Sequence, residues 1–444
     1  MHDPKTVWQR PMMATARLTI IALACSVCAP STLTALDFYV AKTADTNDIF
    51  CASGLPSPPP FDCSLREAIN KANISPGLDH IYIPPGTYNL TRLGDDEDSN
   101  VTGDLDIRDD LEIHRQGPGL VVIDGQNDDR VLDIRPVAGS NTGPLVKLHN
   151  LRIQNGRLEI NNQQGAGVFG YKSTVHILEC EVISNHATGT GNKGGGVACR
   201  EGSMLINEST IRGNSCSDGG GGVSALDGIL LIMNSTIKHN QSDGGSALHS
   251  NLSTTSVLNS TITDNVTYTP GETAGVLASG GTVSIDSCTL SNSWDDSVGV
   301  NLGNPGAITI RNTIISGTCA SGAYAHIATD GGNIEGPGDT CGFVSPGDYY
   351  SVPVFLTPPG DYGGPTETMI PIGVTAQLAV DNIWADPNCL AKDQRGVSRP
   401  VDGDGDGLAS CDSGSAERMG NDPLFIDGFE TGDTSTWPVT VPTG

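Results

Sequence analysis

Short clusters of apolar residues recur at nearly regular intervals along the middle of the chain. One column of aligned positions contains Leu148, Leu178, Ile206, Ile232, Val257, Ile285 and Ile310. A second column, five residues later, contains Ile153, Ile183, Ile211, Ile237, Ile262, Leu290 and Ile315. Successive members of either column are 25 to 30 residues apart, which indicates an internal structural repeat.

Glycine-rich segments lie between these apolar clusters. They are Gly165–Val168, Gly194–Val197, Gly220–Val223, Gly244–Ala247 and Ala274–Val276. The apolar segments are too short and too rich in β-branched residues to be helices, and no intervening segment has helical periodicity. This excludes leucine-rich and βαβ repeats. Short strands joined by tight corners are typical of a parallel β-helix, in which stacked turns share one core.

The apolar pattern continues, less regularly, before residue 148. The earlier segments are Ile81–Ile83, Leu105–Ile107, Leu111–Ile113 and Val121–Ile123. We therefore expect the β-helix to occupy residues 76–320. Residues 321–420 are predicted to form a disulfide-held C-terminal segment, and residues 421–444 an exposed tail.

An asparagine follows the second apolar column in five successive repeats. These residues are Asn155, Asn185, Asn214, Asn240 and Asn265. Asparagine tolerates the left-handed conformation at corners, and stacked amides can hydrogen-bond from one turn to the next. We predict a structural asparagine ladder. N-glycosylation is a poorer explanation, because the Asn-Ser-Thr sequences at 234 and 259 belong to the repeat itself.

A helix is predicted just before the first turn, within an N-terminal segment of residues 36–75. Ser64 and Glu67 have the spacing of a capping box, in which each side chain bonds the other residue's amide. Leu65, Ala68, Ile69 and Ala72 fall on one face of this helix. We expect that face to cover the open end of the core, because solenoids need capped ends.

The sequence around this helix is distinctive. Residues 63–69 read Cys-Ser-Leu-Arg-Glu-Ala-Ile, followed by Ala72-Asn73 and by Tyr-Ile-Pro-Pro-Gly-Thr-Tyr at 82–88. This stretch resembles the CSLREA-domain family of secreted bacterial β-helix proteins, and with the repeats the resemblance covers roughly residues 38–320. It implies a pectin-lyase-like fold at the cell surface or outside the cell, but no defined activity. The predicted fold class is an all-β, right-handed parallel β-helix solenoid with a short N-terminal capping helix and an irregular C-terminal segment.

Two later segments, Asp393–Val397 and Cys411–Gly414, resemble the closing segment of the same large group. We expect this part of the chain to close the second end of the β-helix. The residues at 415–417 depart from the aromatic and acidic ending of surface-anchored relatives, which puts anchoring in doubt. Residues 425–433 are similar to a short tail found on exported gammaproteobacterial proteins.

The N-terminus has the pattern of an export signal, predicted to be residues 1–35. Lys5, Arg10 and Arg17 precede an apolar stretch, Leu18–Ala29, which is too short to span a membrane. The alternatives are a start at Met12 or Met13 rather than Met1, and lipid attachment at Cys25. The expected location is extracellular or at the outer membrane of a Gram-negative bacterium, with no transmembrane segment in the mature chain.

The cysteines fit an exported protein. Ten remain after the signal, and none has zinc-type spacing. Disulfides are therefore expected. The predicted sequence-neighbour pairs are Cys51–Cys63, Cys319–Cys341 and Cys389–Cys411. Cys180, Cys199, Cys216 and Cys288 lie within the repeats and receive no assignment.

The formal net charge of the 444-residue chain is −27. Such an acidic chain repels phosphate backbones, so we expect no nucleic-acid partner. Cations are better partners, and Asp402, Asp404 and Asp406 alternate with glycines in a way that suits one Ca²⁺ ion. A complete EF-hand is absent because position 413 is serine. The alternative is a flexible acidic turn held by the Cys389–Cys411 bond.

Two functions remain open at this point. The first is a non-catalytic, adhesin-like protein that binds a polysaccharide or cell-surface ligand along the β-helix. The second is a polysaccharide lyase or glycoside hydrolase with an atypical site, which needs clustered acids. Asp218 and Asp243 are one repeat apart. They are suited either to bind a cation together or to be solvated separately at the corners. His176, His186, His239 and His249 share no position in the repeat and are expected at the surface.

Overall fold

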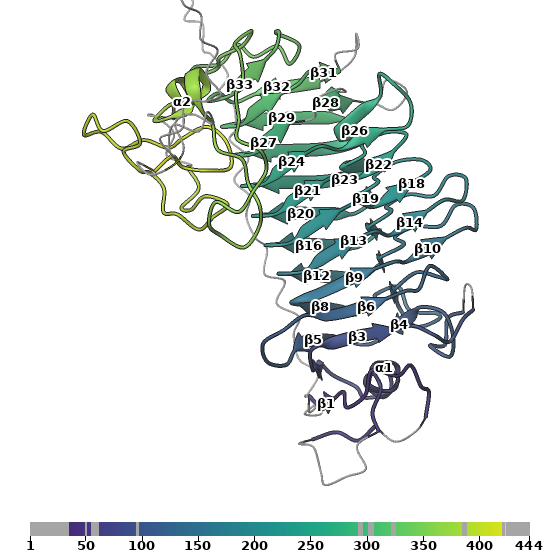
Figure 1. Ribbon diagram of the computed structural model, residues 1–444. Helices are drawn as coiled ribbons and strands as arrows, with labels where there is room; N and C mark the ends of the chain where they lie inside the picture. The colour runs from purple at the N-terminus through teal and green to yellow at the C-terminus, as the bar shows by residue number, and fades with distance from the viewer. Residues whose placement is uncertain are drawn as a thin grey trace, which may run out of the picture. The chain divides into compact units, whose positions relative to one another are not determined.

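A computed structural model gives the architecture. It describes residues 35–48, 51–54, 62–94, 97–291, 296–300, 306–320, 326–383, 389–419 and 422. Nearly all regular structure in these residues is parallel β-strand, and the strands stack in sequence order from β2 to β33 (Figure 1). The predicted parallel β-helix is therefore confirmed. Almost all of the predicted cleavable signal and of the predicted tail lies outside the described residues.

The largest sheet, sheet A, has two ladders that merge in the long strands β23 and β26. We call them the β4 ladder and the β2 ladder. The β4 ladder contains β4 (Leu105–Ile107), β7 (Leu132–Ile134), β11 (Val168–Tyr171), β15 (Val197–Arg200), β19 (Val223–Leu226), β23 (Leu248–Leu258), β26 (Thr273–Asp286), β28 (Asp296–Val300) and β31 (Cys319–Ala320). The β2 ladder contains β1 (Asp37–Tyr39), β2 (Asp79–Ile83), β5 (Leu111–Arg115), β8 (Leu145–His149), β12 (Thr174–Leu178), β16 (Ser203–Asn207), β20 (Ile229–Met233), the second halves of β23 and β26, β29 (Ala307–Arg311) and β32 (His326–Thr329).

Two further sheets complete each turn. Sheet B contains β3 (Gly86–Asn89), β6 (Val121–Asp124), β9 (Leu151–Gln154), β13 (Glu181–Ile183), β17 (Thr210–Arg212), β21 (Thr236–Lys238), β24 (Thr261–Thr263), β27 (Thr289–Ser291), β30 (Ile314–Ser316) and β33 (Ile334–Gly336). Sheet C contains the two-residue strands β10 (Arg157–Leu158), β14 (His186–Ala187), β18 (Ser215–Cys216), β22 (Gln241–Ser242) and β25 (Val266–Thr267). Since β32 pairs with β29 in sheet A and β33 pairs with β30 in sheet B, the β-helix extends past the predicted boundary at residue 320.

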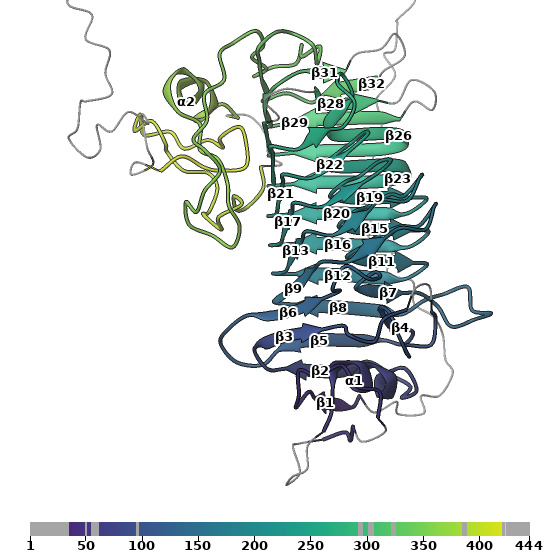
Figure 2. The ribbon, with the colours of Figure 1, turned by 45° about the vertical axis from the view of Figure 1, so that its right-hand side comes forward.

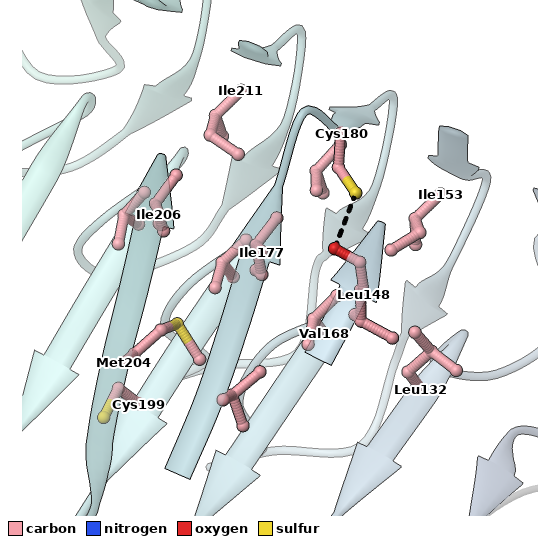
Figure 3. Close-up of a cluster of buried hydrophobic side chains, with 14 of the residues drawn as sticks. Leu132, Leu148, Ile153, Val168, Ile177, Cys180, Cys199, Met204, Ile206 and Ile211 are labelled. Carbon is pink, nitrogen blue, oxygen red and sulfur yellow. Dashed lines mark hydrogen bonds between the residues drawn. The ribbon is translucent and has the colours of Figure 1, made fainter. Parts of the chain in front are cut away.

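Alternate residues of each strand point into one continuous core, as the two apolar columns predict. Figure 3 shows this packing around Leu148 and Ile206. The predicted register is wrong by one residue in a single turn. Ile177, not Leu178, pairs with Leu148, and Val182, not Ile183, pairs with Ile153. Ile177 and Val182 are fully buried, whereas Leu178 is only partly buried.

The asparagine ladder is present over four of its five predicted members. Asn185, Asn214, Asn240 and Asn265 are buried and joined side chain to side chain at 2.9–3.0 Å. Asn155 instead donates to Asp124 at 2.9 Å. Of the five asparagines, only Asn155 has the expected left-handed backbone conformation. In the other four turns the residue before the asparagine has the positive φ: Ser184, Gly213, His239 and Asp264.

The N-terminal cap has the predicted form. Helix α1 (Leu65–Ala72) begins after Ser64, whose hydroxyl accepts the Glu67 amide at 3.2 Å. Glu67 accepts the Ser64 amide at 3.0 Å, which completes the capping box. The apolar face of α1 is buried in the main core beside β2, at the N-terminal end of the stack (Figure 2).

The part of the C-terminal segment after residue 356 does not close the second end of the stack as expected. Its described residues between 357 and 419, including α2 (Gly373–Ala379), lie beside the outer face of sheet B (Figure 1). The outer positions there are threonines, which offer hydroxyls: Thr261 donates to Gln394 at 2.7 Å, and Thr289 bonds Ser415 at 3.0 Å. Phe343, which follows the last strand in the sequence, is fully buried in the main core cluster.

All three predicted disulfides are present: Cys51–Cys63, Cys319–Cys341 and Cys389–Cys411. The other four cysteines, Cys180, Cys199, Cys216 and Cys288, are buried and unpaired. Burial raises the pKa of each of these thiols to about 12, so they pack as small apolar groups. In Figure 3 Cys180 and Cys199 lie among the core side chains.

Candidate functional site

The tetrapeptide Leu-Asp-Ile-Arg occurs in two successive turns of the β4 ladder, at residues 105–108 and 132–135. The leucines and isoleucines are fully buried in the core, so Asp106 and Asp133 between them lie on the outer face of the sheet. The two aspartates are in register on neighbouring strands. Each side chain is only 1% exposed, because arginines and the preceding loop cover them.

Three arginines surround these carboxylates. Arg108 bonds Asp106 directly and lies 3.7 Å from Asp133. Arg130 lies 3.4 Å from Asp133, and Arg135 donates its Nε to Asp133 at 2.9 Å. With two further acids, these residues form what we call the acid–arginine cluster: Asp98, Asp104, Asp106, Asp133, Arg108, Arg130 and Arg135.

The cluster contains two carboxyl groups with strongly altered acidity. Burial raises the pKa of Asp106 to about 7, with the Arg108 guanidinium opposing this shift and the Asp133 charge adding to it. Burial also raises the pKa of Asp104 well above its usual range, with Arg130 opposing. Carboxylate oxygens of Asp98, Asp106 and Asp133 lie within 4.8 Å of one another. A proton-holding carboxyl beside a charged one is the arrangement that acid–base catalysis uses.

Phe169 on β11 extends the cluster by one turn, since it is in register with Asp133. The guanidinium carbons of Arg130 and Arg135 lie 5.1 and 5.9 Å from the centre of its ring. Cations at this distance are attracted to the ring face. The same two arginines therefore connect the acids to an aromatic surface.

Tyr171 continues this surface on the outer side. Its ring centre is 6.4 Å from that of Phe169, and the two rings are nearly parallel. The Lys172 ammonium and the Arg200 guanidinium lie 5.1 and 5.7 Å from the Tyr171 ring centre. We call Phe169, Tyr171, Lys172 and Arg200 the aromatic patch. Tyr171 is partly exposed and Arg200 is exposed, so the patch faces solvent.

Only two of the three predicted Ca²⁺ ligands lie close together. Oxygens of Asp402 and Asp404 lie within 4.8 Å of each other and of Asp381, whereas Asp406 is not part of this group. Asp406 instead accepts the Leu408 amide at 2.8 Å. Asp381 follows helix α2 and is too far away in sequence for the glycine–aspartate pattern to indicate it.

The other candidates from the sequence have ordinary structural roles. Asp218 and Asp243 lie on adjacent turns, and Lys193 pairs with Asp218. His249 is buried, against the expectation of a surface position, and bonds Ser279 at 2.9 Å. Burial lowers the pKa of His249 to about 4, which makes it a weak base.

Sequence reasoning missed the acid–arginine cluster. The repeated Leu-Asp-Ile-Arg tetrapeptide was an available signal, because a charge between two core positions of a strand needs a partner. It lies on the β4 ladder, whereas the two apolar columns follow the β2 ladder and sheet B, so the column alignment did not reach it.

Comparison with known proteins supports the fold. A family model described as a right handed beta helix region matches residues 137–314. The chain is a right-handed parallel β-helix. Among solved structures, the crystal structure of pectate lyase Pel9A is similar with a TM-score of 0.40 and 12% identity, over 80% of this chain and 91% of that chain. Similarity this weak does not transfer an activity. No curated protein matches the chain.

No helix in the described part of the chain is long and apolar enough to cross a membrane.

Proposed function

We propose that the protein is a non-catalytic glycan-binding β-helix that uses the aromatic patch and the adjoining acid–arginine cluster as its binding surface. The observation that carries this proposal is that both Lys172 and Arg200 lie close to the ring of Tyr171, which is on the outer face of the β4 ladder. A sugar ring has an apolar C–H face and a rim of hydroxyl or carboxylate groups. An aromatic ring suits the first, and guanidinium and ammonium groups suit the second.

The state of the acids favours binding over catalysis. Asp106 and Asp133 are each engaged by at least one arginine, and both are almost fully buried. A buried carboxylate held by an arginine is out of hydrogen-bond reach of an incoming substrate, which leaves it poorly placed to attack the substrate or to transfer a proton to it. The surface is also part of a rigid sheet, which keeps its side chains in place before the ligand arrives.

Replacing Tyr171 by alanine is expected to weaken polysaccharide binding by about tenfold or more, because a central aromatic contact supplies much of the affinity of such a surface. Affinity would be measured against acidic and neutral polysaccharides, with and without Ca²⁺. Tyr350→Ala is the matched control, since Tyr350 is 48% exposed and belongs to the C-terminal segment. Equal loss in both variants, or none in Tyr171→Ala, would contradict the proposal.

A second candidate is a polysaccharide hydrolase or lyase centred on Asp106 and Asp133. It is favoured by the raised pKa of Asp106 and by the grouping of carboxylate oxygens of Asp98, Asp106 and Asp133, because glycosidases use a pair of neighbouring carboxyl groups. The same polysaccharide panel separates the two candidates. Turnover that disappears in Asp106→Asn supports the enzyme, and binding without turnover supports the binder.

We also propose that the protein binds Ca²⁺, at a revised site formed by Asp381, Asp402 and Asp404. Backbone amides of Gly403 and Ser410 hold the Asp381 carboxylate at 3.1 and 2.6 Å, and burial raises its pKa. Carboxylate oxygens from a glycine-rich loop are suitable Ca²⁺ ligands.

We expect Ca²⁺ at about 100 times its Kd to stabilise the wild-type protein by about 2.7 kcal/mol, and this gain to disappear in Asp381→Asn. Denaturation with and without Ca²⁺ measures it. Asp406→Asn is the control and should keep the full gain, because Asp406 lies outside the group. Loss of the gain in Asp406→Asn alone would restore the original assignment.

The proposed location is outside the cytoplasm of a bacterium, with the chain related to the CSLREA-domain proteins. Three disulfides are typical of proteins that fold in an oxidising compartment. Helix α1 supports the relationship to the CSLREA-domain proteins, because the residues of the Cys-Ser-Leu-Arg-Glu-Ala motif have defined roles in closing the end of the β-helix.

A further inference from the structure

A second group of polar side chains lies on the outer face of the β2 ladder, on strands β2 and β5. Ile81 and Ile113 are fully buried, so their neighbours His80, Glu112 and His114 point outward. His80 pairs in register with Glu112, and His114 is two residues further along β5. All three side chains are partly exposed.

Three atoms of these side chains converge on one point. The Nε2 atom of His114 lies 3.2 Å from Oε2 of Glu112 and 3.4 Å from Nδ1 of His80. The same Glu112 oxygen lies 3.8 Å from Nδ1 of His80. One hydrogen bond can join only two of these three atoms. A single shared proton therefore does not explain why all three atoms lie close together.

A metal ion accounts for all three contacts. Zn²⁺ binds imidazole nitrogen and carboxylate oxygen at about 2.0–2.2 Å in a tetrahedron, which places the ligand atoms about 3.3–3.5 Å apart. The observed separations of 3.2, 3.4 and 3.8 Å need only a small adjustment. Two imidazoles and one carboxylate are also a donor set that zinc sites use, with the fourth position left for water or another ligand.

The neighbours hold these ligands in position. Lys147 binds the other carboxylate oxygen of Glu112 at 2.5 Å, which leaves Oε2 facing the imidazoles. The His114 ring stacks between Tyr82 and His149, with ring centres 5.5 and 4.6 Å away. Outer-shell contacts of this kind fix the orientation of the ligands.

We propose that His80, Glu112 and His114 form a binding site for a divalent transition-metal ion such as Zn²⁺, with an open coordination position toward solvent. The site is separate from the aromatic patch, since it lies on the other ladder of sheet A. It is therefore independent of the glycan-binding proposal. The donor set favours Zn²⁺ over Ca²⁺ and Mg²⁺, which prefer oxygen ligands.

The test is a titration of the full-length, chelator-treated protein with Zn²⁺ by calorimetry. We expect one tight site per chain, weakened about 100-fold or more in His114→Ala and in His80→Ala, and weakened in Glu112→Gln. His176→Ala is the matched control, because His176 lies on the outer face of the same ladder but outside the triangle. It should bind as the wild type does.

A second measurement on the unaltered protein keeps the test independent of how the variants fold. Co²⁺ in place of Zn²⁺ should give the intense visible absorption of a tetrahedral site with imidazole ligands. An absence of tight Zn²⁺ binding in the wild-type protein, or equal binding in the wild type and the histidine variants, would overturn the proposal. A Co²⁺ spectrum typical of six oxygen ligands would overturn it as well.

Discussion

Replacing Arg66 by methionine is expected to lower the free energy of unfolding by about 3–5 kcal/mol, the usual cost of breaking a buried ion pair by removing one partner. The Arg66 side chain, which lies on the capping helix α1, is fully buried. Its Nε donates to Asp45 at 2.7 Å, and its terminal nitrogens donate to the carbonyls of Gly103 and Asp104 at 2.8 and 2.7 Å. Methionine fills much of the space but leaves these acceptors unpaired.

Urea denaturation followed by circular dichroism measures the effect. Arg212→Met is the control, because the Arg212 side chain is 42% exposed and its contact with Glu181 is 3.9 Å long. We expect that control to change stability by less than about 1 kcal/mol. Similar stability of the two variants would show that the cap contributes little to the fold.

The contacts of Arg66 and its neighbours explain why the Cys-Ser-Leu-Arg-Glu-Ala motif indicates a fold and not an activity. Cys63 holds the preceding segment by a disulfide, and Ser64 and Glu67 cap the helix. Leu65 and Ala68 pack on the core, while Arg66 ties the helix to the following loop. Each position of the motif is used to close the end of the β-helix.

Most of the fold followed from the sequence because inward positions must be apolar in every turn. The error at Leu178 shows the limit of that reasoning. Both Leu178 with Ile183 and Ile177 with Val182 keep a five-residue spacing, so periodicity alone does not choose between them. The corner decides the register: Glu179 has the same left-handed backbone as Glu208 in the next turn, and this alignment makes Ile177 the core residue.

The candidate sites were harder to predict, because they depend on which outward positions meet across turns of unequal length. His80 and Glu112 are 32 positions apart, and Asp106 and Asp133 are 27 apart. The 32-residue separation is longer than the 25 to 30 residues of the turns after residue 148. The 27-residue separation is within that range, but Asp106 and Asp133 lie on the β4 ladder, which the two apolar columns do not follow. Asp381 was missed for a related reason, since the C-terminal segment has no repeat and meets its loop only in the folded chain.

Asp133→Asn is expected to lower the free energy of unfolding by about 3–5 kcal/mol. The substitution keeps the shape of the side chain and removes the charge that faces three guanidinium groups, of which Arg130 is only 5% exposed. Arg130 would keep Asp104 at 3.1 Å, while Arg135 would lose its nearest buried partner. Chemical denaturation at neutral pH measures the loss.

Asp98→Asn is the matched control within the same cluster. Asp98 contacts Arg108 and Arg135 at 3.4 and 3.2 Å, but its side chain is 62% exposed, so we expect a change below about 1 kcal/mol. The sign of the result at Asp133 also bears on function. Catalytic acids are often held at a cost to stability, so a stabilised Asp133→Asn protein would favour the hydrolase. A large loss would mean that Asp133 serves first to hold the arginines beside Phe169, as the glycan-binding proposal requires.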